Sequence, residues 1–177
     1  MLGYLRDTSG VLFSRHHMPL QICGDPNRSA RSSVSLVLAP RGAVLLVAQT
    51  TANGPRPHDP EPQVIAEAIA AFQWDNRSRA QLGEPELDSM TIPCITMIGT
   101  RPTFYLVPVT RELSDAIATA QYPRSPTVVK KCVAELEGIQ PSEGMENLAF
   151  RQFALQHFTA FRTLAKGHWS AFMVEVD

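Results

Sequence analysis

The sequence predicts an α/β domain built from short strands and longer helices. Several short runs of β-branched and apolar residues have the spacing of strands, and two longer stretches carry apolar residues at helical spacing. The predicted strands cover 34–38, 43–48, 92–98 and 103–109, and the predicted helices cover 62–74 and 145–165. Because the two kinds of element alternate along the chain, the α/β class is favoured over an all-α or all-β one.

The first predicted hairpin joins 34–38 to 43–48. In the earlier strand, apolar side chains recur at every second residue, which is the period of a β-strand. Residues 39–42 (APRG) break this strand and turn the chain. The run 43–48 (AVLLVA) is continuously apolar, as expected of a strand that is covered on both faces. We therefore expect the second strand to lie in the middle of the sheet.

A helix is predicted directly after a proline-rich loop. Residues 51–62 contain four prolines and one glycine, which exclude regular strand pairing. Glu61 and Pro62 suit the first turn of a helix, because an acidic side chain complements the helix dipole there and proline lacks an N–H that would go unused. The helix is expected to end at Trp74, and the polar, turn-rich residues 75–91 are expected to form a loop.

The second half of the chain is predicted to hold the other hairpin and the long helix. Thr110 follows this hairpin and has the side chain of a helix N-cap. Residues 127–136 are compatible with either a strand or a helix. The long helix over 145–165 is expected to end at Gly167, because glycine readily adopts the backbone angles of a C-terminal cap.

Size, charge and cysteine content limit the classes of protein to consider. The 177 residues suit one domain, so residues 1–177 are treated as a single unit. The 16 basic residues against 17 acidic ones give a net charge of −1, which excludes binding of nucleic acid through a strongly basic coat. The three cysteines form no C-x-x-C pair, and reduced thiols point to an intracellular protein of the cytoplasm or nucleus. No apolar stretch reaches the ~20 residues that span a membrane.

Residues 63–73 read QVIAEAIAAFQ and follow a predicted hairpin and a loop. This order, a hairpin and then a helix beginning near a glutamine, resembles the central unit of the PD-(D/E)XK nuclease-like (restriction-endonuclease-like) superfamily. The chain is most similar to a group of uncharacterised fungal proteins whose helix reads Q-x-x-A-E-A-I-A-A-F-Q. The resemblance extends over residues 33–130 and implies a restriction-endonuclease-like core, with a mixed central sheet and flanking helices.

The catalytic positions that the resemblance implies are neutral in this chain. Active members carry an aspartate on one strand and an acid-x-lysine motif on the next, and their carboxylates hold Mg²⁺. The matching positions here are Ser35 for the aspartate, Ala48 for the acid and Thr50 for the lysine. Only Gln63 and Glu67 remain from the pattern. We therefore expect no phosphodiesterase activity at this site and no cofactor, with Mg²⁺ required if any activity persists.

Two other groups of residues are weighed as sites. Asp59, Glu61 and Glu67 surround the start of the predicted helix and would form a displaced metal site if they converged. The favoured interpretation is that the first two stabilise the helix start. Arginine outnumbers lysine 13 to 3, and arginine suits recognition of phosphate. The candidate nucleic-acid-binding residues are Arg28, Arg31, Arg41, Arg77 and Arg79, although overall neutrality favours scattered surface charges.

Three hypotheses about function follow. The first is a non-catalytic nuclease-like domain that binds a protein or nucleic-acid partner. The second is a metal-dependent nuclease with a relocated carboxylate site, and the third is a small-molecule binder or enzyme of unrelated chemistry. Active relatives place a helix before the first strand, where this chain offers only a short segment, so we also expect an open sheet edge that favours a homodimer.

Overall fold

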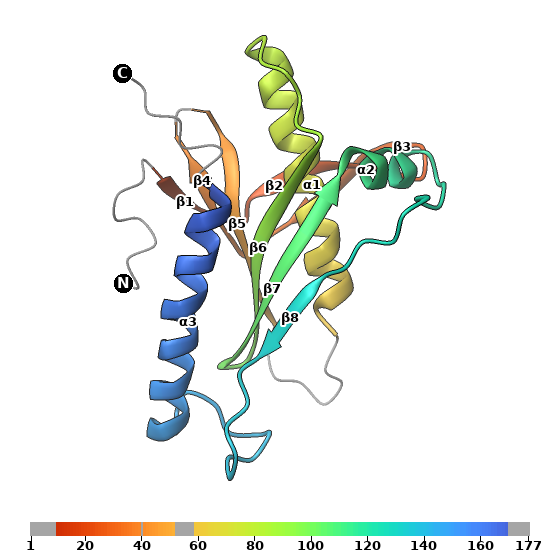
Figure 1. Ribbon diagram of the computed structural model, residues 1–177. Coiled ribbons are helices and arrows are strands. Elements are labelled where there is room, and N and C mark those ends of the chain that lie inside the picture. The colour runs from red at the N-terminus through yellow and green to blue at the C-terminus, as the bar shows by residue number, and fades with distance from the viewer. Residues whose placement is uncertain (1–9, 40, 52–58, 170–177) are drawn as a thin grey trace.

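The computed structural model describes residues 10–39, 41–51 and 59–169. These residues form an α/β fold in which helices cover a mixed six-stranded sheet of order β1-β4-β5-β6-β7-β8 (Figure 1). The strands are β1 (Gly10–Ser14), β4 (Val34–Leu38), β5 (Ala43–Thr51), β6 (Ser89–Ile98), β7 (Arg101–Thr110) and β8 (Lys130–Val133). Strands β5 and β6 are parallel, and every other neighbouring pair is antiparallel. The predicted α/β class with a mixed central sheet is confirmed.

A long bent hairpin begins the described chain. Strands β2 (His17–Ile22) and β3 (Asp25–Arg31) pair with each other in a second sheet, and they continue β1 and β4 beyond a bend. At the bend, Arg15 N donates to Ser33 O at 3.0 Å and Ser32 N donates to His16 O at 3.2 Å. The β2–β3 arm crosses over helix α1 towards α2 (Figure 1). In this region the sequence by itself indicates only one short strand, at 20–23 (LQIC).

Helix α1 (Glu61–Gln81) lies between the central sheet and the β2–β3 arm. It runs well past Trp74, so the prediction of a loop directly after that residue was wrong. The polar residues that follow are compatible with a helix, and the buried Asp75 carboxylate accepts a hydrogen bond from Val44 N at 2.9 Å. The helix ends where Gly83, with a φ of +73°, allows Glu84 N to reach Arg79 O.

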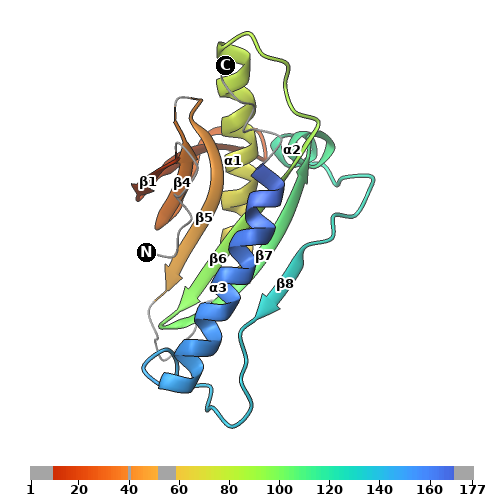
Figure 2. The same ribbon diagram turned by 60° about the vertical axis from the view of Figure 1, so that its left-hand side comes forward.

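Helices α2 (Arg111–Ala118) and α3 (Leu148–Trp169) complete the domain. Thr110 caps α2 as predicted, since its side chain accepts from Leu113 N at 3.1 Å. Helix α3 lies across β6 and β7 (Figure 2). It continues through Gly167, contrary to prediction, because Trp169 is fully buried and its Nε1 donates to Leu45 O at 2.6 Å. None of the described helices is long and apolar enough to span a membrane.

Candidate functional site

A polar cavity of about 610 Å³ opens where the bent hairpin meets helix α1. Hydroxyl, amide and guanidinium groups belong to most of the lining residues, and three aliphatic side chains and one carboxyl group complete it. The lining residues are Arg15, Leu20, Ser29, Ala30, Arg31, Ser32, Ser33, Gln49, Thr50, Gln63, Ala66 and Glu67. The cavity therefore combines hydrogen-bond donors and acceptors with the positive charges of Arg15 and Arg31.

The backbone bend of the hairpin positions one border of the cavity. Arg15 has a φ of +52°, a left-handed conformation that is uncommon for a residue with a side chain. Beside it, Ser32 is buried and shares a 2.6 Å hydrogen bond with the Oγ of Ser35. The two strands leave the central sheet at this point, so the bend opens the space that the cavity occupies.

A buried carboxyl group lies in the wall that α1 contributes. Glu67 is 1% exposed, and its Oε1 accepts a 3.0 Å hydrogen bond from Nε2 of the exposed Gln63. Its Oε2 has no hydrogen-bond partner. Burial raises the pKa of Glu67 from 4.5 to about 7, and the Gln63 hydrogen bond opposes part of that rise. Cys94 is itself fully buried, and its burial and the nearby negative charge of Glu67 raise the pKa of the Cys94 thiol. The thiol is therefore a poor nucleophile.

A second hydrogen-bonded group joins β4 to β5 at the cavity. Gln49 Oε1 accepts from both the backbone N and the Oγ of Ser33, each at 3.0 Å. The Ser33 Oγ in turn accepts from Thr50 N and lies 3.1 Å from Thr50 Oγ1. These contacts hold the polar end of β5 against the bend, so the hydroxyl and amide groups are fixed in place before any ligand binds.

The strand register shows which residues share a face with Ser35. Ser35 is fully buried and lies opposite Val47, while Val34 lies opposite Ala48. Because side chains alternate along a strand, Val47 and then Gln49 share the face of Ser35, and Ala48 points to the other face. Thr50 is exposed and lines the cavity.

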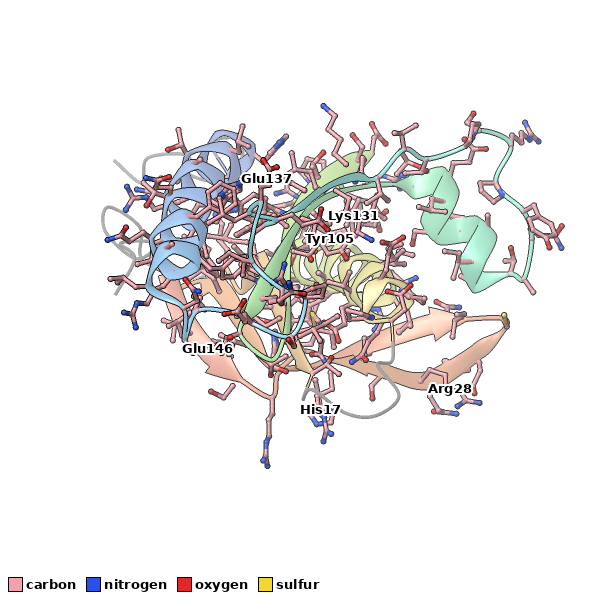
Figure 3. All side chains as sticks on the ribbon, turned by 90° about the horizontal axis from the view of Figure 1, so that it is seen from below. His17, Arg28, Tyr105, Lys131, Glu137 and Glu146 are labelled. Carbon is pink, nitrogen blue, oxygen red and sulfur yellow. The ribbon has the colours of Figure 1, made fainter. Side chains whose placement is uncertain are left out.

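The three acidic candidates do not converge. Asp59 accepts from Glu61 N at 3.0 Å, and Glu61 forms a 2.6 Å ion pair with Lys131. Lys131 lies 5.6 Å from the centre of the Tyr105 ring, and Figure 3 shows both residues on the side of α1 away from the β2–β3 arm. Glu67 instead faces the cavity. Among residues 10–39, 41–51 and 59–169, no three His, Cys, Asp or Glu side chains form a metal-binding group.

The candidate arginines are divided among separate places. Arg28 pairs with Asp25 at 2.9 Å and points outward from the arm (Figure 3). Arg41 and Arg79 both pair with Glu84, at 3.7 and 3.1 Å. Arg77 is exposed on α1. Of the five candidates, Arg31 alone lines the cavity, and it does so together with Arg15, which the sequence analysis did not single out.

The sequence analysis also missed Ser32, Ser33 and Gln49. Their only signal was position: the first two come directly before a predicted strand, and Gln49 comes directly after one. The pairing of β1 with β4 and the bend beyond it bring these residues to the cavity.

Comparison of the chain with protein-family models, with curated proteins and with solved structures finds no match in any of the three.

Proposed function

We propose that this chain is a non-catalytic nuclease-like domain that binds nucleic acid at the polar cavity. The order of its central elements supports the nuclease-like core. Antiparallel strands β4 and β5 are followed by α1, which crosses over to β6, parallel to β5. This is the hairpin, helix and mixed sheet that the resemblance to PD-(D/E)XK proteins implies.

Neutral residues at the catalytic positions support the absence of catalysis. Ser35 offers a hydroxyl in place of a carboxylate. On the next strand, the sequence match puts the acid and lysine positions at Ala48 and Thr50. If these positions must instead lie on the same sheet face as Ser35, they are Val47 and Gln49. Neither pair supplies a carboxylate for Mg²⁺ or an ammonium group to steady the developing charge.

The single observation that carries nucleic-acid binding is the pair of arginines at the cavity. Arg15 and Arg31 line it and form no ion pair with any described residue, whereas Arg28, Arg41 and Arg79 are each paired with an acid. Guanidinium groups without acidic partners are suited to phosphate. The neighbouring Ser29 hydroxyl adds a donor of the kind that commonly contacts phosphate and sugar.

The other hypotheses have less support. A relocated nuclease site requires converging carboxylates, and Asp59 and Glu61 are engaged at the start of α1 while Glu67 faces the cavity. A site for an apolar small molecule would have a mainly hydrophobic lining. Among the residues that the structure describes, the aliphatic contributors to this cavity are Leu20, Ala30 and Ala66.

The test is fluorescence anisotropy with labelled single-stranded RNA and DNA of about eight nucleotides. We expect a Kd of about 10⁻⁴ to 10⁻⁶ M for wild type and weaker, still measurable binding at low salt in the double variant Arg15→Ala, Arg31→Ala. Removing two phosphate contacts should reduce the slope of log K against log salt by about 1.4. The matched control, Arg28→Ala with Arg77→Ala, removes the same charge outside the cavity and should bind as wild type does.

Cleavage of the same oligonucleotides with added Mg²⁺ is the second readout. We expect no product from wild type. Product that disappears in Glu67→Gln would show that the domain is catalytic, and absence of binding by wild type at low salt would overturn the nucleic-acid proposal.

A further inference from the structure

The hydrogen bond between Gln63 and Glu67 leaves two acceptors in the lining of the cavity. The Gln63 amide uses its Nε2 as the donor to Glu67 Oε1, so its Oε1 carbonyl remains an acceptor without a donor among the described residues. The second carboxylate oxygen, Glu67 Oε2, is buried and has no partner. A buried acceptor without a donor is costly, and proteins retain few of them.

The rest of the cavity lining has the opposite character. Arg15 and Arg31 offer donors and positive charge there, and Ser29 offers a hydroxyl. A ligand that satisfies both parts of the lining carries an anion and also N–H donors. The arginines disfavour a cationic ligand, such as a lysine or arginine side chain of a partner, by like-charge repulsion.

We propose that the Gln63–Glu67 pair reads the base of a bound nucleotide and selects guanine. Guanine presents two adjacent donors, N1–H and the N2 amino group, on its Watson–Crick edge. Adenine and cytosine place an amino group beside an acceptor, and uracil places its N–H between two acceptors. Only guanine therefore matches the two acceptors of Gln63 and Glu67. The proposal rests on the nucleic-acid binding proposed above.

Space and contact also fit a nucleotide. The cavity volume of about 610 Å³ lies within the roughly 300–1,000 Å³ that small-ligand sites occupy. Leu20, Ala30 and Ala66 supply apolar surface for a base. Gln63 is exposed and is hydrogen-bonded to Glu67, so rotation of the Gln63 side chain gives the base access to the buried oxygen. One ligand N–H would then donate to Glu67 in place of the Gln63 amide, and the other would donate to Gln63 Oε1.

The test varies one base in an otherwise uridine oligonucleotide of about eight residues, at about pH 8, where Glu67 is ionised. We expect central guanosine to bind at least about tenfold tighter than adenosine, cytidine or uridine. Inosine, which keeps N1–H and lacks the amino group, should fall between. Glu67→Gln should remove the preference, while Glu137→Gln, which removes the same charge from an exposed site, should keep it. The inosine comparison changes only the ligand, so it holds even if a variant folds poorly.

Other outcomes separate this inference from the function it rests on. Equal binding of all five oligonucleotides would overturn guanine selection and leave nucleic-acid binding in place. Guanosine monophosphate that binds, with the same dependence on Glu67, when no oligonucleotide does would support the base reading and assign the site to a free nucleotide. Binding of an arginine-containing peptide in preference to every nucleotide would overturn both proposals.

Discussion

The two faces of the central sheet are buried by different chemistry. On the face covered by α3, Phe104 lies with its ring centre 5.0 Å from each of Phe158 and Phe161. On the face covered by α1, the buried side chains include Glu67 and Asp75, both acids with a carboxylate oxygen that has no hydrogen-bond partner. Burial raises the pKa of both carboxyl groups.

The two faces are therefore expected to differ in what they contribute: the α3 face to the stability of the fold, and the α1 face to the proposed binding. Aromatic contacts on the α3 face contribute free energy because they remove apolar surface from water. The α1 face keeps polar groups at a cost in desolvation, and such groups are retained where a ligand or a switch needs them. We therefore expect substitutions on the α3 face to affect folding, and those on the α1 face to affect folding and binding in opposite directions.

The largest expected effect breaks the α3 face. Phe104→Ala removes a ring that is 3% exposed and should lower the free energy of unfolding by about 4 kcal/mol, because the cavity left behind cannot collapse fully. Urea unfolding followed by circular dichroism measures this. Phe13→Ala is the matched control, since Phe13 is 46% exposed on β1 and its loss should cost less than about 1 kcal/mol. Equal losses in the two variants would contradict the assignment of the core.

The second expected effect is a pH dependence of the free energy of unfolding that comes from the buried carboxyl of Glu67 on the α1 face. Because the pKa of Glu67 is raised from 4.5 to about 7 by folding, the folded chain holds a proton there that the unfolded chain releases. The contribution of Glu67 to the free energy of unfolding should thus fall by about 3 kcal/mol as the pH rises through this range. Glu67→Gln should remove that part of the dependence, leaving the part due to Asp75, while Glu137→Gln should leave the full dependence. An unchanged profile in Glu67→Gln would show that this carboxyl is not desolvated.

The third effect loosens the arm that covers α1. Gln73 accepts from Gln21 N at 2.8 Å and donates to Gln21 O at 3.2 Å and to Ser114 Oγ at 3.3 Å. Gln73→Ala should lower the free energy of unfolding by about 2 kcal/mol, because the Gln21 backbone and the buried Ser114 hydroxyl lose hydrogen-bond partners. Hydrogen exchange of the Gln21 backbone N–H should also become faster in this variant, while exchange of the N–H groups of β6 should change less. The exposed Gln156 is the control, and its change to alanine should leave both quantities unaltered.

Local sequence was sufficient for the elements whose signals are local. The hairpin around the turn at 99–102 and the Thr110 cap were confirmed, because alternation, turn residues and capping depend on neighbours along the chain. The sequence predicts the end of α1 too early, because the polar residues after Trp74 have the composition of a loop. Their helix is stabilised by the distant contact of Asp75 with Val44, which no local pattern encodes.

For the candidate site, the sequence by itself determined that Ser35, Ala48 and Thr50 are neutral and that Gln63 and Glu67 share one helix. Only the tertiary structure decided that Arg15, Arg31 and Gln49 meet Thr50, Gln63 and Glu67 around one cavity. The physical reason is that burial and register arise from strand pairing between distant residues, such as β1 with β4. The same long-range packing removes water from Glu67, and so gives an ordinary helix residue a pKa near 7.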